Sequence, residues 1–517
     1  MAESKFYRMI EWIYAIFVIG VLVVITVLDN NWYYIYKNDC KVPNIVFLVI
    51  FVIAAGIIVF ARMSYIESHK EIPQPAPMKL QDSMKMIGYL SIVLFLFQLF
   101  YAVAIWFETG WDCRELVTAA RDMALNGTPI GDSHYFSIYP NNVFLTGIFA
   151  GIIKGVSMCG IPAAYFPLIA IGCALVSATG YFFADCIRVL TARKSLMYLS
   201  WILYVILTGL SPWISIPYSD TYSIFFPTFC IWLYLTKDDK NYLPTWFSIT
   251  VAAFVGYFIK PTVLLTFIVL FFFQIVHGAS IRKSVPKMVR YKHTIGFLLT
   301  VLLGVTVAYA MKFGMEKITG FTPDENKHFT AAHYLMMGAN YEYGGGYNQT
   351  DVNASASYAT VAERNAGDIK EAARRIGEMF PFKLVKFASQ KCLTNFNDGT
   401  YAWGNEGAFY WEYYERDDGF SKFVRSFIYH IGDRHDIWVA FCQAFWYVNL
   451  CFCALLCLKG RRHKNYKETA ILTLMLAIMC FLMVFEARAR YLYLYSPIIY
   501  MCGALGLNRL LLGKDAK

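Results

Sequence analysis

Apolar stretches long enough to cross a lipid bilayer recur along almost the whole 517-residue chain. A spanning helix needs about 20 mainly apolar residues. In the bilayer interior every backbone N–H and C=O must be paired, which restricts spanning segments to helices and closed barrels. Hydrophobic residues make up 58% of the chain and charged residues 16%, against about 25% charged residues in soluble domains. These patterns predict an all-α polytopic membrane protein.

Twelve segments are predicted to span the membrane. They are residues 10–28, 44–61, 86–106, 162–187, 195–209, 222–235, 244–259, 262–277, 294–311, 438–458, 470–485 and 492–511. Lys5 and Arg8 precede the first segment, and no small-residue cleavage site follows it. The first segment is therefore expected to remain in the protein as a span rather than to be removed as a signal peptide.

The basic residues set the orientation of these spans. They gather in short clusters at 188–194, 282–292 and 459–467, which the positive-inside rule places in the cytoplasm together with both termini. The net charge of +10 therefore does not indicate nucleic-acid binding. A further apolar stretch, 143–158, would reverse every later span if it crossed the membrane. It is interpreted as a helix at or dipping into the outer surface, and a true span is the alternative.

This orientation divides the chain into four parts. Residues 1–85 form a transmembrane hairpin with a cytoplasmic loop, and 86–311 form the transmembrane core, with a first outer loop at 107–160. Residues 312–436 form a mixed external domain, in which 361–380 is predicted to be a helix stopped by Pro381. The glycine-rich stretch 341–347 (YEYGGGY) is its expected mobile part. Residues 437–517 supply the last spans.

Polar residues crowd into the first outer loop, 111–142 (WDCRELVTAARDMALNGTPIGDSHYFSIYPNN). Apolar residues from Leu116 to Ala124 recur at helical spacing, which predicts a short surface helix that begins just after Asp112. An aspartate at that place is either a helix cap or a reactive carboxylate. The nearby aromatic run and amides favour a sugar site, and its residues are Tyr135, Tyr139, Asn141 and Asn142.

The combination of Asp112, the following A-x-x-A-R-D-M-like helix and Tyr139-Pro140 resembles the GT-C glycosyltransferases. Specifically, it is similar to the protein O-mannosyltransferase superfamily, which includes the lipid A aminoarabinose transferases. The resemblance runs from Met86 to the end of the chain. It implies a GT-C fold and transfer of a sugar from a polyprenyl-phosphate carrier, with Asp112 as the catalytic base. The family often has Asp-Glu where this chain has Asp112-Cys113.

Three cations on the predicted outer side are candidates to bind the carrier phosphate. Lys260 interrupts a long apolar stretch, where a lysine costs about 2.5–3.5 kcal/mol on insertion scales. The alternative is that it snorkels at a helix end. Arg488 and Arg490 oppose the positive-inside bias, and their E-x-R-x-R-Y run followed by Pro497 resembles a C-terminal signature of the family. An internal salt bridge to Glu486 is the alternative for either arginine.

The remaining polar candidates lie in later outer segments. Asp220 either caps a helix, orients the acceptor or binds a cation. His328 and His333 of the external domain are expected to point towards the site. No residues have metal-ligand spacing, and D-x-D, Walker and H-E-x-x-H motifs are absent from the sequence, so a metal is not indicated. Cys40, Cys113 and Cys392 are all predicted to be external, which would allow one disulfide between two of them.

Together these features predict an inverting glycosyltransferase of a bacterial plasma membrane with its site on the extracytoplasmic side. The donor is a polyprenyl-phosphate-linked sugar, with no other cofactor expected. The acceptor is a cell-envelope glycan, or else a lipid or a protein. The alternatives are a transporter or flippase of lipid-linked sugars, for which repeat symmetry and midplane charges are expected, and a non-catalytic GT-C relative.

Overall fold

The computed structural model describes residues 2–32, 35–69, 80–161, 164–236, 242–281, 287–406, 409–456 and 466–512. Within these ranges the regular structure is helical, apart from isolated bridges between Glu108 and Glu412 and between Gly131 and Phe321. The all-α prediction is confirmed. The prediction of a mixed external domain is wrong for the described residues of 312–436. The regular elements there are helices such as α16 (Val361–Met379), which is rich in Ala, Glu and Arg, strong helix formers.

Eight helices are long and apolar enough to cross a membrane. They are α1 (Ala2–Val27), α2 (Asn44–His69), α3 (Leu80–Ile105), α7 (Tyr165–Thr191), α11 (Tyr242–Ile259), α13 (Lys287–Thr319), α19 (His435–Leu455) and α20 (Tyr466–Val484). Four more predicted spans coincide with other helices: α8 (Lys194–Tyr204), α10 (Phe225–Thr236), α12 (Leu264–Ile281) and α21 (Ser496–Leu512). The chain is therefore a multi-pass membrane protein.

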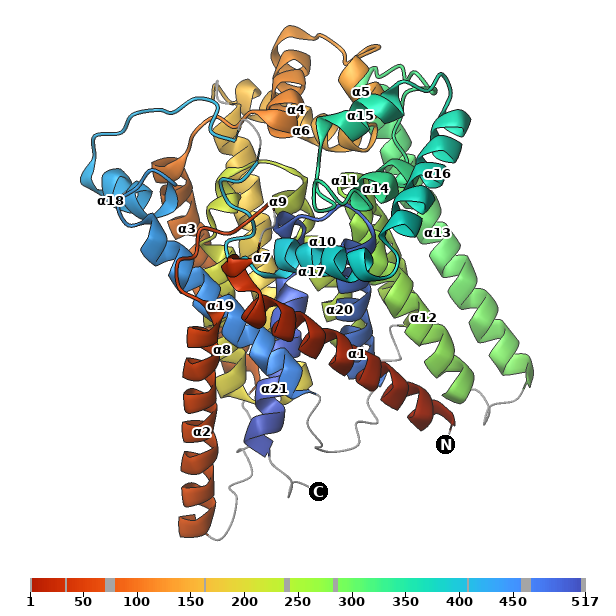
Figure 1. The fold of residues 1–517 in the computed structure, drawn as a ribbon. Helices are drawn as coiled ribbons and strands as arrows, with labels where there is room; N and C mark the ends of the chain where they lie inside the picture. The colour runs from red at the N-terminus through yellow and green to blue at the C-terminus, as the bar shows by residue number, and fades with distance from the viewer. Residues whose placement is uncertain are drawn as a thin grey trace.

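The helices arrange the chain with two distinct ends (Figure 1). The N-terminal end of α1 and the C-terminal end of α21 lie at the bottom of the view, whereas α4 (Trp111–Arg121), α5 (His134–Ile138) and α15 (Gln349–Ala356) gather at the top. The first outer loop and the long polar segment thus lie at the same end of the molecule. This is the arrangement that the charge pattern predicts.

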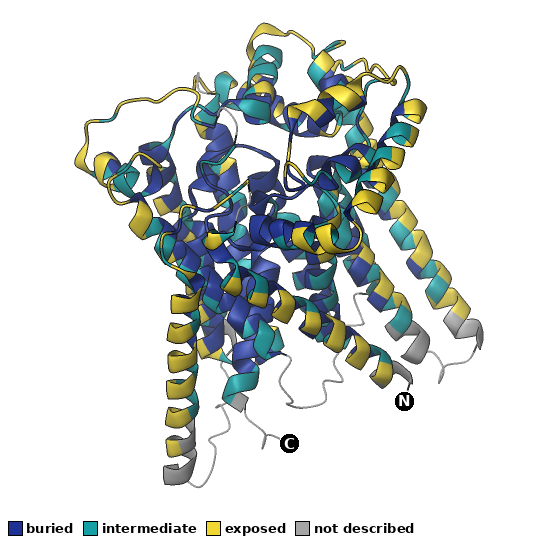
Figure 2. Ribbon diagram, in the orientation of Figure 1, coloured by how far each residue is buried: buried dark blue, intermediate teal, exposed yellow. Residues whose placement is uncertain are grey.

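The outward faces of the peripheral helices are apolar. Figure 2 shows exposed residues along α2 and α13 and a buried interior between the helices. Ile53 and Phe60 of α2 and Leu302 of α13 are more than half exposed. Soluble proteins seldom expose such continuous apolar surface, so these faces are suited to contact with lipid chains.

The helix predicted after Asp112 is present as α4. Its apolar face, with Leu116, Val117 and Ala120, is buried. The chain then makes one π-helical turn and leaves the helix at Gly127, whose φ of +70° is the left-handed conformation that glycine adopts easily. The stretch predicted as a surface helix forms α6 (Asn141–Met158), which packs against α4, α11 and α13. It is not among the eight candidate spans.

The external segment is built on α16, as its sequence predicts. Thr360 and Glu363 form a reciprocal capping box at its start, and it ends at Met379, just before Pro381. Arg364 on this helix is buried and donates hydrogen bonds to the backbone carbonyls of Ser355 and His328. The guanidinium therefore ties the loop after α13 to α15 and α16, and gives the external segment a fixed shape.

Candidate functional site

Asp112 lies in the first turn of α4 but does not cap this helix. The N-cap residue is Gly110, and no side-chain capping bond occurs there. Instead the Asp112 carboxylate accepts a hydrogen bond of 2.8 Å from the hydroxyl of Tyr218, which directly precedes α9 (Ser219–Ser223). Tyr218 is buried, whereas Asp112 is partly exposed. Tyr218 therefore orients the carboxylate, and Asp112 remains partly accessible to solvent.

Tyr135 and Asn142 complete the surroundings of this carboxylate. The Tyr135 hydroxyl accepts a hydrogen bond of 2.7 Å from the Asn142 amide, and burial together with the nearby Asp112 carboxylate raises its pKa. The ring of Tyr139 lies 5.3 Å from that of Tyr135, and Asn141, which is exposed, donates to the Asn142 side chain. We call Asp112, Tyr135, Asn142 and Tyr218 the Asp112 group.

Lys260 occupies the break between α11 and a 3-10 turn that starts at Pro261. Its ammonium is buried and forms an ion pair with Asp220 in α9. Asp220 makes no capping bond, because the N-cap of α9 is Tyr218 without a side-chain bond. The ammonium also lies 4.8 Å from the centre of the Tyr491 ring. Lys260 therefore points into the protein rather than snorkelling outwards.

The two predicted arginines converge on the same place. In Arg490, Nε lies 3.6 Å from Asp220 and Nη1 lies 3.5 Å from Glu406. Arg488 Nη2 lies 3.4 Å from the other oxygen of Glu406. Glu486 is buried beside them, and burial raises the pKa of its carboxyl against the opposing charge of Arg488. We call this set the charge cluster: Asp220, Lys260, Glu406, Glu486, Arg488 and Arg490.

The charge cluster holds three carboxylates and three cations, and all of them are buried except Glu406, whose side chain is 9% exposed. Such balance is needed, because an unpaired buried charge costs several kcal/mol. The pairing around Arg490 is loose, however. Among the described residues, Nε and Nη1 of Arg490, one oxygen of Asp220 and one of Glu406 are buried without a hydrogen-bond partner. The guanidinium therefore retains donors for the oxygen atoms of a ligand.

Two aromatic side chains join the Asp112 group to the charge cluster. The Arg490 guanidinium lies 4.8 Å from the Trp111 ring and 5.6 Å from the Tyr218 ring. Trp111 directly precedes Asp112 and has a φ of +43°, a conformation that costs energy in a non-glycine residue and persists only where packing holds it. The carboxylate of Asp112 and the guanidinium of Arg490 are thus separated by single side chains.

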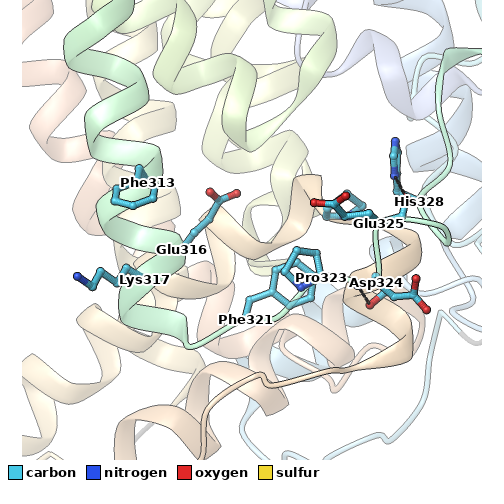
Figure 3. A pocket seen from close by; sticks show the side chains of 10 residues that line it. Phe313, Glu316, Lys317, Phe321, Pro323, Asp324, Glu325 and His328 are labelled. Carbon is cyan, nitrogen blue, oxygen red and sulfur yellow. Dashed lines mark hydrogen bonds between the residues drawn. The ribbon is translucent and has the colours of Figure 1, made fainter. Parts of the chain in front are cut away.

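The two predicted histidines lie elsewhere. His328 borders a hollow of about 760 Å³ between the end of α13 and the loop that follows it (Figure 3), where its Nδ1 lies 3.1 Å from the Glu325 carbonyl oxygen. His333 is buried in α14 (Ala331–Gly338), hydrogen-bonded to Ser355, and burial lowers its pKa to about 4. No hydrogen bond, ion pair or ring contact joins either of them to the Asp112 group or the charge cluster among the described residues. His333 is buried against Ser355, which corrects the expectation that it points to the site, whereas the expectation for His328 stays a prediction.

Sequence reasoning missed two members of the site. Tyr218 lies two residues before Asp220 in a predicted outer stretch. A single tyrosine has no sequence pattern that distinguishes a functional residue from a packing residue. Glu406 is an isolated acid in the aromatic and glycine-rich run from Tyr401 to Tyr410. Its isolation was the available signal, since an acid among aromatic residues is seldom left without a partner.

The cysteines and other metal-binding side chains form no further site in the described part of the chain. Cys40, Cys113 and Cys392 are buried free thiols. No group of three or more His, Cys, Asp or Glu residues there is arranged to hold a metal ion. The candidate site among the described residues therefore consists of the Asp112 group and the charge cluster.

Comparison with known proteins gives a match over almost the full length. The family described as conserved hypothetical integral membrane protein matches residues 3–510. The matched region includes α1 and α2. No curated protein matches the chain.

Proposed function

We propose that this chain, which belongs to the family of conserved hypothetical integral membrane proteins, is an inverting glycosyltransferase of GT-C type. It would move one sugar from a polyprenyl-phosphate carrier to an acceptor outside the cytoplasm of a bacterial cell. One observation carries the proposal: Tyr218 donates its hydroxyl to Asp112 while its ring lies against Arg490. A carboxylate and a buried cationic group are thereby adjacent, and the reaction needs both.

Asp112 serves as the general base in this proposal. It takes the proton of the acceptor hydroxyl as the acceptor oxygen attacks the anomeric carbon, and the bond from that carbon to the carrier phosphate breaks on the opposite face. The hydrogen bond that Asp112 accepts comes from the neutral hydroxyl of Tyr218. It orients the carboxylate without pairing it with a cation, which suits a general base.

The charge cluster serves the leaving phosphate. Guanidinium and ammonium groups form strong charge-assisted hydrogen bonds with phosphate oxygens and stabilise charge that develops in a transition state. Arg490 has buried donors without hydrogen-bond partners, and its distances to Asp220 and Glu406 are longer than ordinary hydrogen bonds. A phosphate oxygen can compete for such donors. Asp220 and Glu406 then hold the cations in place rather than contact the acceptor.

The aromatic side chains beside Asp112 suit the sugar. Sugar rings stack on aromatic faces and take hydrogen bonds from amides and hydroxyls. Tyr135, Tyr139 and Asn142 supply these groups on one side of the carboxylate. An envelope glycan is the proposed acceptor, because the polar segments of the site share one end of the molecule with the external helices.

Deletion of the gene and complementation test the proposed function. A strain that lacks this protein should lose one sugar from an envelope glycan, and the wild-type gene should restore it. Asp112→Asn should fail to restore it at equal protein level. Glu115→Gln is the matched control, because Glu115 lies one turn away on α4 and is exposed. An unchanged envelope composition in the deletion strain would contradict the proposal.

Labelling of single cysteines tests the side of the membrane. Ser357 is exposed in the external segment, so Ser357→Cys should react with an impermeant thiol reagent added to intact cells. The exposed Cys159 and Cys480 are first replaced by serine to remove background labelling. Reaction only after the cells are opened would place the site in the cytoplasm and overturn the extracytoplasmic assignment.

A further inference from the structure

The loop between α1 and α2 reaches the charge cluster through Tyr36. The Tyr36 ring lies 4.0 Å from the guanidinium carbon of Arg488, and its hydroxyl donates a hydrogen bond of 3.0 Å to the carbonyl of Tyr347. Arg488 faces Glu406 with the same guanidinium. One face of this cation is thus covered by a side chain from the N-terminal hairpin, more than 400 positions away in the sequence.

The glycine run of the external segment is shaped to receive Tyr36. A Cβ atom at Gly346 would overlap the Tyr36 ring, so the close approach requires glycine. The neighbouring Gly345 accepts a hydrogen bond of 2.8 Å from the backbone N–H of Ala487, between Glu486 and Arg488. The predicted mobile turn is therefore attached on one side to the arginine segment and on the other to Tyr36.

A buried polar network fixes the base of the same loop. Asp29, in the 3-10 turn that follows α1, accepts a hydrogen bond from the N–H of Asn44 at the start of α2. The Asn44 amide donates to the Asn397 side chain, and Gln443 of α19 donates to both asparagines. All four side chains are buried. Buried polar networks that are well satisfied favour one arrangement of the chain, so Tyr36 is held from a rigid base.

The Tyr36 ring adds to a small set of contacts that place Arg488. The backbone N–H of Arg488 donates to the Asn395 side chain, and Nη1 donates a long hydrogen bond of 3.4 Å to the Asn405 carbonyl. The guanidinium also contacts Glu406 and the Tyr36 ring. An aromatic face over a desolvated cation attracts it and restricts the rotamers of the arginine. The ring accepts no hydrogen bond from the guanidinium in this contact, so the N–H donors stay available for oxygen ligands.

We propose that Tyr36 is a positioning residue that holds Arg488 for the carrier phosphate, so that the α1–α2 hairpin completes the phosphate-binding site. The proposal rests on the proposed function. It extends the site to a part of the chain that the GT-C resemblance does not cover. It also predicts that the turn at 344–346 acts with Tyr36, because both contact the segment that carries Arg488.

Binding of two lipid probes to the full-length protein in detergent tests the proposal. The probes are a polyprenyl monophosphate without sugar and the corresponding polyprenol. Wild type should bind the monophosphate more tightly than the polyprenol. Tyr36→Leu should weaken binding of the monophosphate about tenfold and leave the polyprenol unchanged, whereas Tyr36→Phe, which keeps the ring over Arg488, should stay within about threefold of wild type.

Two further variants separate positioning from general loosening of the fold. Gly346→Ala should displace the Tyr36 ring and reproduce the effect of Tyr36→Leu. Phe423→Leu is the matched control, because it removes an exposed ring that lies 5.6 Å from another guanidinium, that of Arg434. It should leave the binding of both probes unchanged. In combination with Arg488→Gln, Tyr36→Leu should add less than twofold, because the cation that it positions is already gone.

Each outcome decides one point. Equal weakening of both probes by Tyr36→Leu, or an effect that is fully additive with Arg488→Gln, would overturn the positioning role. Wild-type affinity in Tyr36→Leu would do the same and leave the proposed function intact. Failure of the wild-type protein to distinguish the monophosphate from the polyprenol would overturn the proposed carrier, and the role of Tyr36 with it.

Discussion

The Asp112 group and the charge cluster lie side by side, yet they differ in whether each charged side chain has an oppositely charged neighbour. Asp112 is a partly exposed carboxylate that accepts a hydrogen bond from the neutral hydroxyl of Tyr218. In the charge cluster, three carboxylates, of which Glu406 is only partly buried, face three buried cations. A partly exposed carboxylate can remain without a cation because water solvates it, whereas buried charges persist only when each has an opposite neighbour. Substitutions in the first should therefore change chemistry, and substitutions in the second should change stability.

The largest expected effect is on the rate of transfer in Asp112→Asn. Loss of the general base should lower the rate about a thousandfold, equivalent to about 4 kcal/mol, while the thermal unfolding midpoint stays at the wild-type value. Initial rates of sugar transfer in membranes of the complemented strain measure this. Asp132→Asn, in the exposed loop after α4, is the control and should keep the wild-type rate. A rate near wild type in Asp112→Asn would remove Asp112 from the mechanism.

Asp220→Asn should show the opposite behaviour, with stability as its main loss. It leaves Lys260 and Arg490 with one carboxylate fewer in a buried place, which should lower the free energy of unfolding by about 3 kcal/mol. Adding Lys260→Met restores the charge balance, so the double variant should be more stable than Asp220→Asn alone. Thermal unfolding in detergent measures both. Purely additive losses would show that the pair is not coupled.

The pH dependence of stability should separate the external domain from both groups. The pKa of His333 is about 4 in the folded protein, against 6.5 in the unfolded chain. Between these values the unfolded chain binds a proton that the folded protein does not, so stability is complete above about pH 6.5 and is lost as the pH falls towards 4, by roughly 3 kcal/mol. His333→Gln should reduce the change of the free energy of unfolding with pH across this range and leave the transfer rate unchanged. A changed rate would return His333 to the site.

Tyr218→Phe should give the smallest effect and separate the two roles of this side chain. The ring against Arg490 is kept, and the hydroxyl that donates to Asp112 is lost. Hydrogen bonds to charged groups contribute about 1.5–3 kcal/mol, so the transfer rate should fall about tenfold with little change in stability. Tyr222→Phe, which loses a hydroxyl bound to the Leu168 carbonyl, is the matched control for the rate. Equal rates in the two variants would show that Asp112 needs no help from Tyr218.

The helices and much of the site could be predicted because their signals are local. The apolar runs predict α1, α2 and α7, and Pro381 predicts the end of α16. Lys260 and Arg490 stand out because charge is costly in apolar surroundings. Their pairing with Asp220 and Glu406 could not be predicted, since nothing in one segment specifies the partner that another segment brings to it.

The histidines show the limit of the same reasoning. His328 and His333 occur in a polar external segment, where the sequence does not distinguish a ligand-binding histidine from a structural one. Burial against Ser355 and the Phe329 ring decides the role of His333. This burial depends on how α14 packs on α16, which is a property of the tertiary structure.

The amino-acid sequence by itself determined that this protein is a helical membrane protein with an aspartate and three cations in polar breaks between its apolar segments. Hydropathy and helix signals act over neighbouring residues, and they are readable for that reason. Only the tertiary structure decided that Tyr218 joins Asp112 to Arg490, that Glu406 balances both arginines, and that Tyr36 covers Arg488. These contacts link segments far apart in the chain, and burial makes their charges dependent on one another.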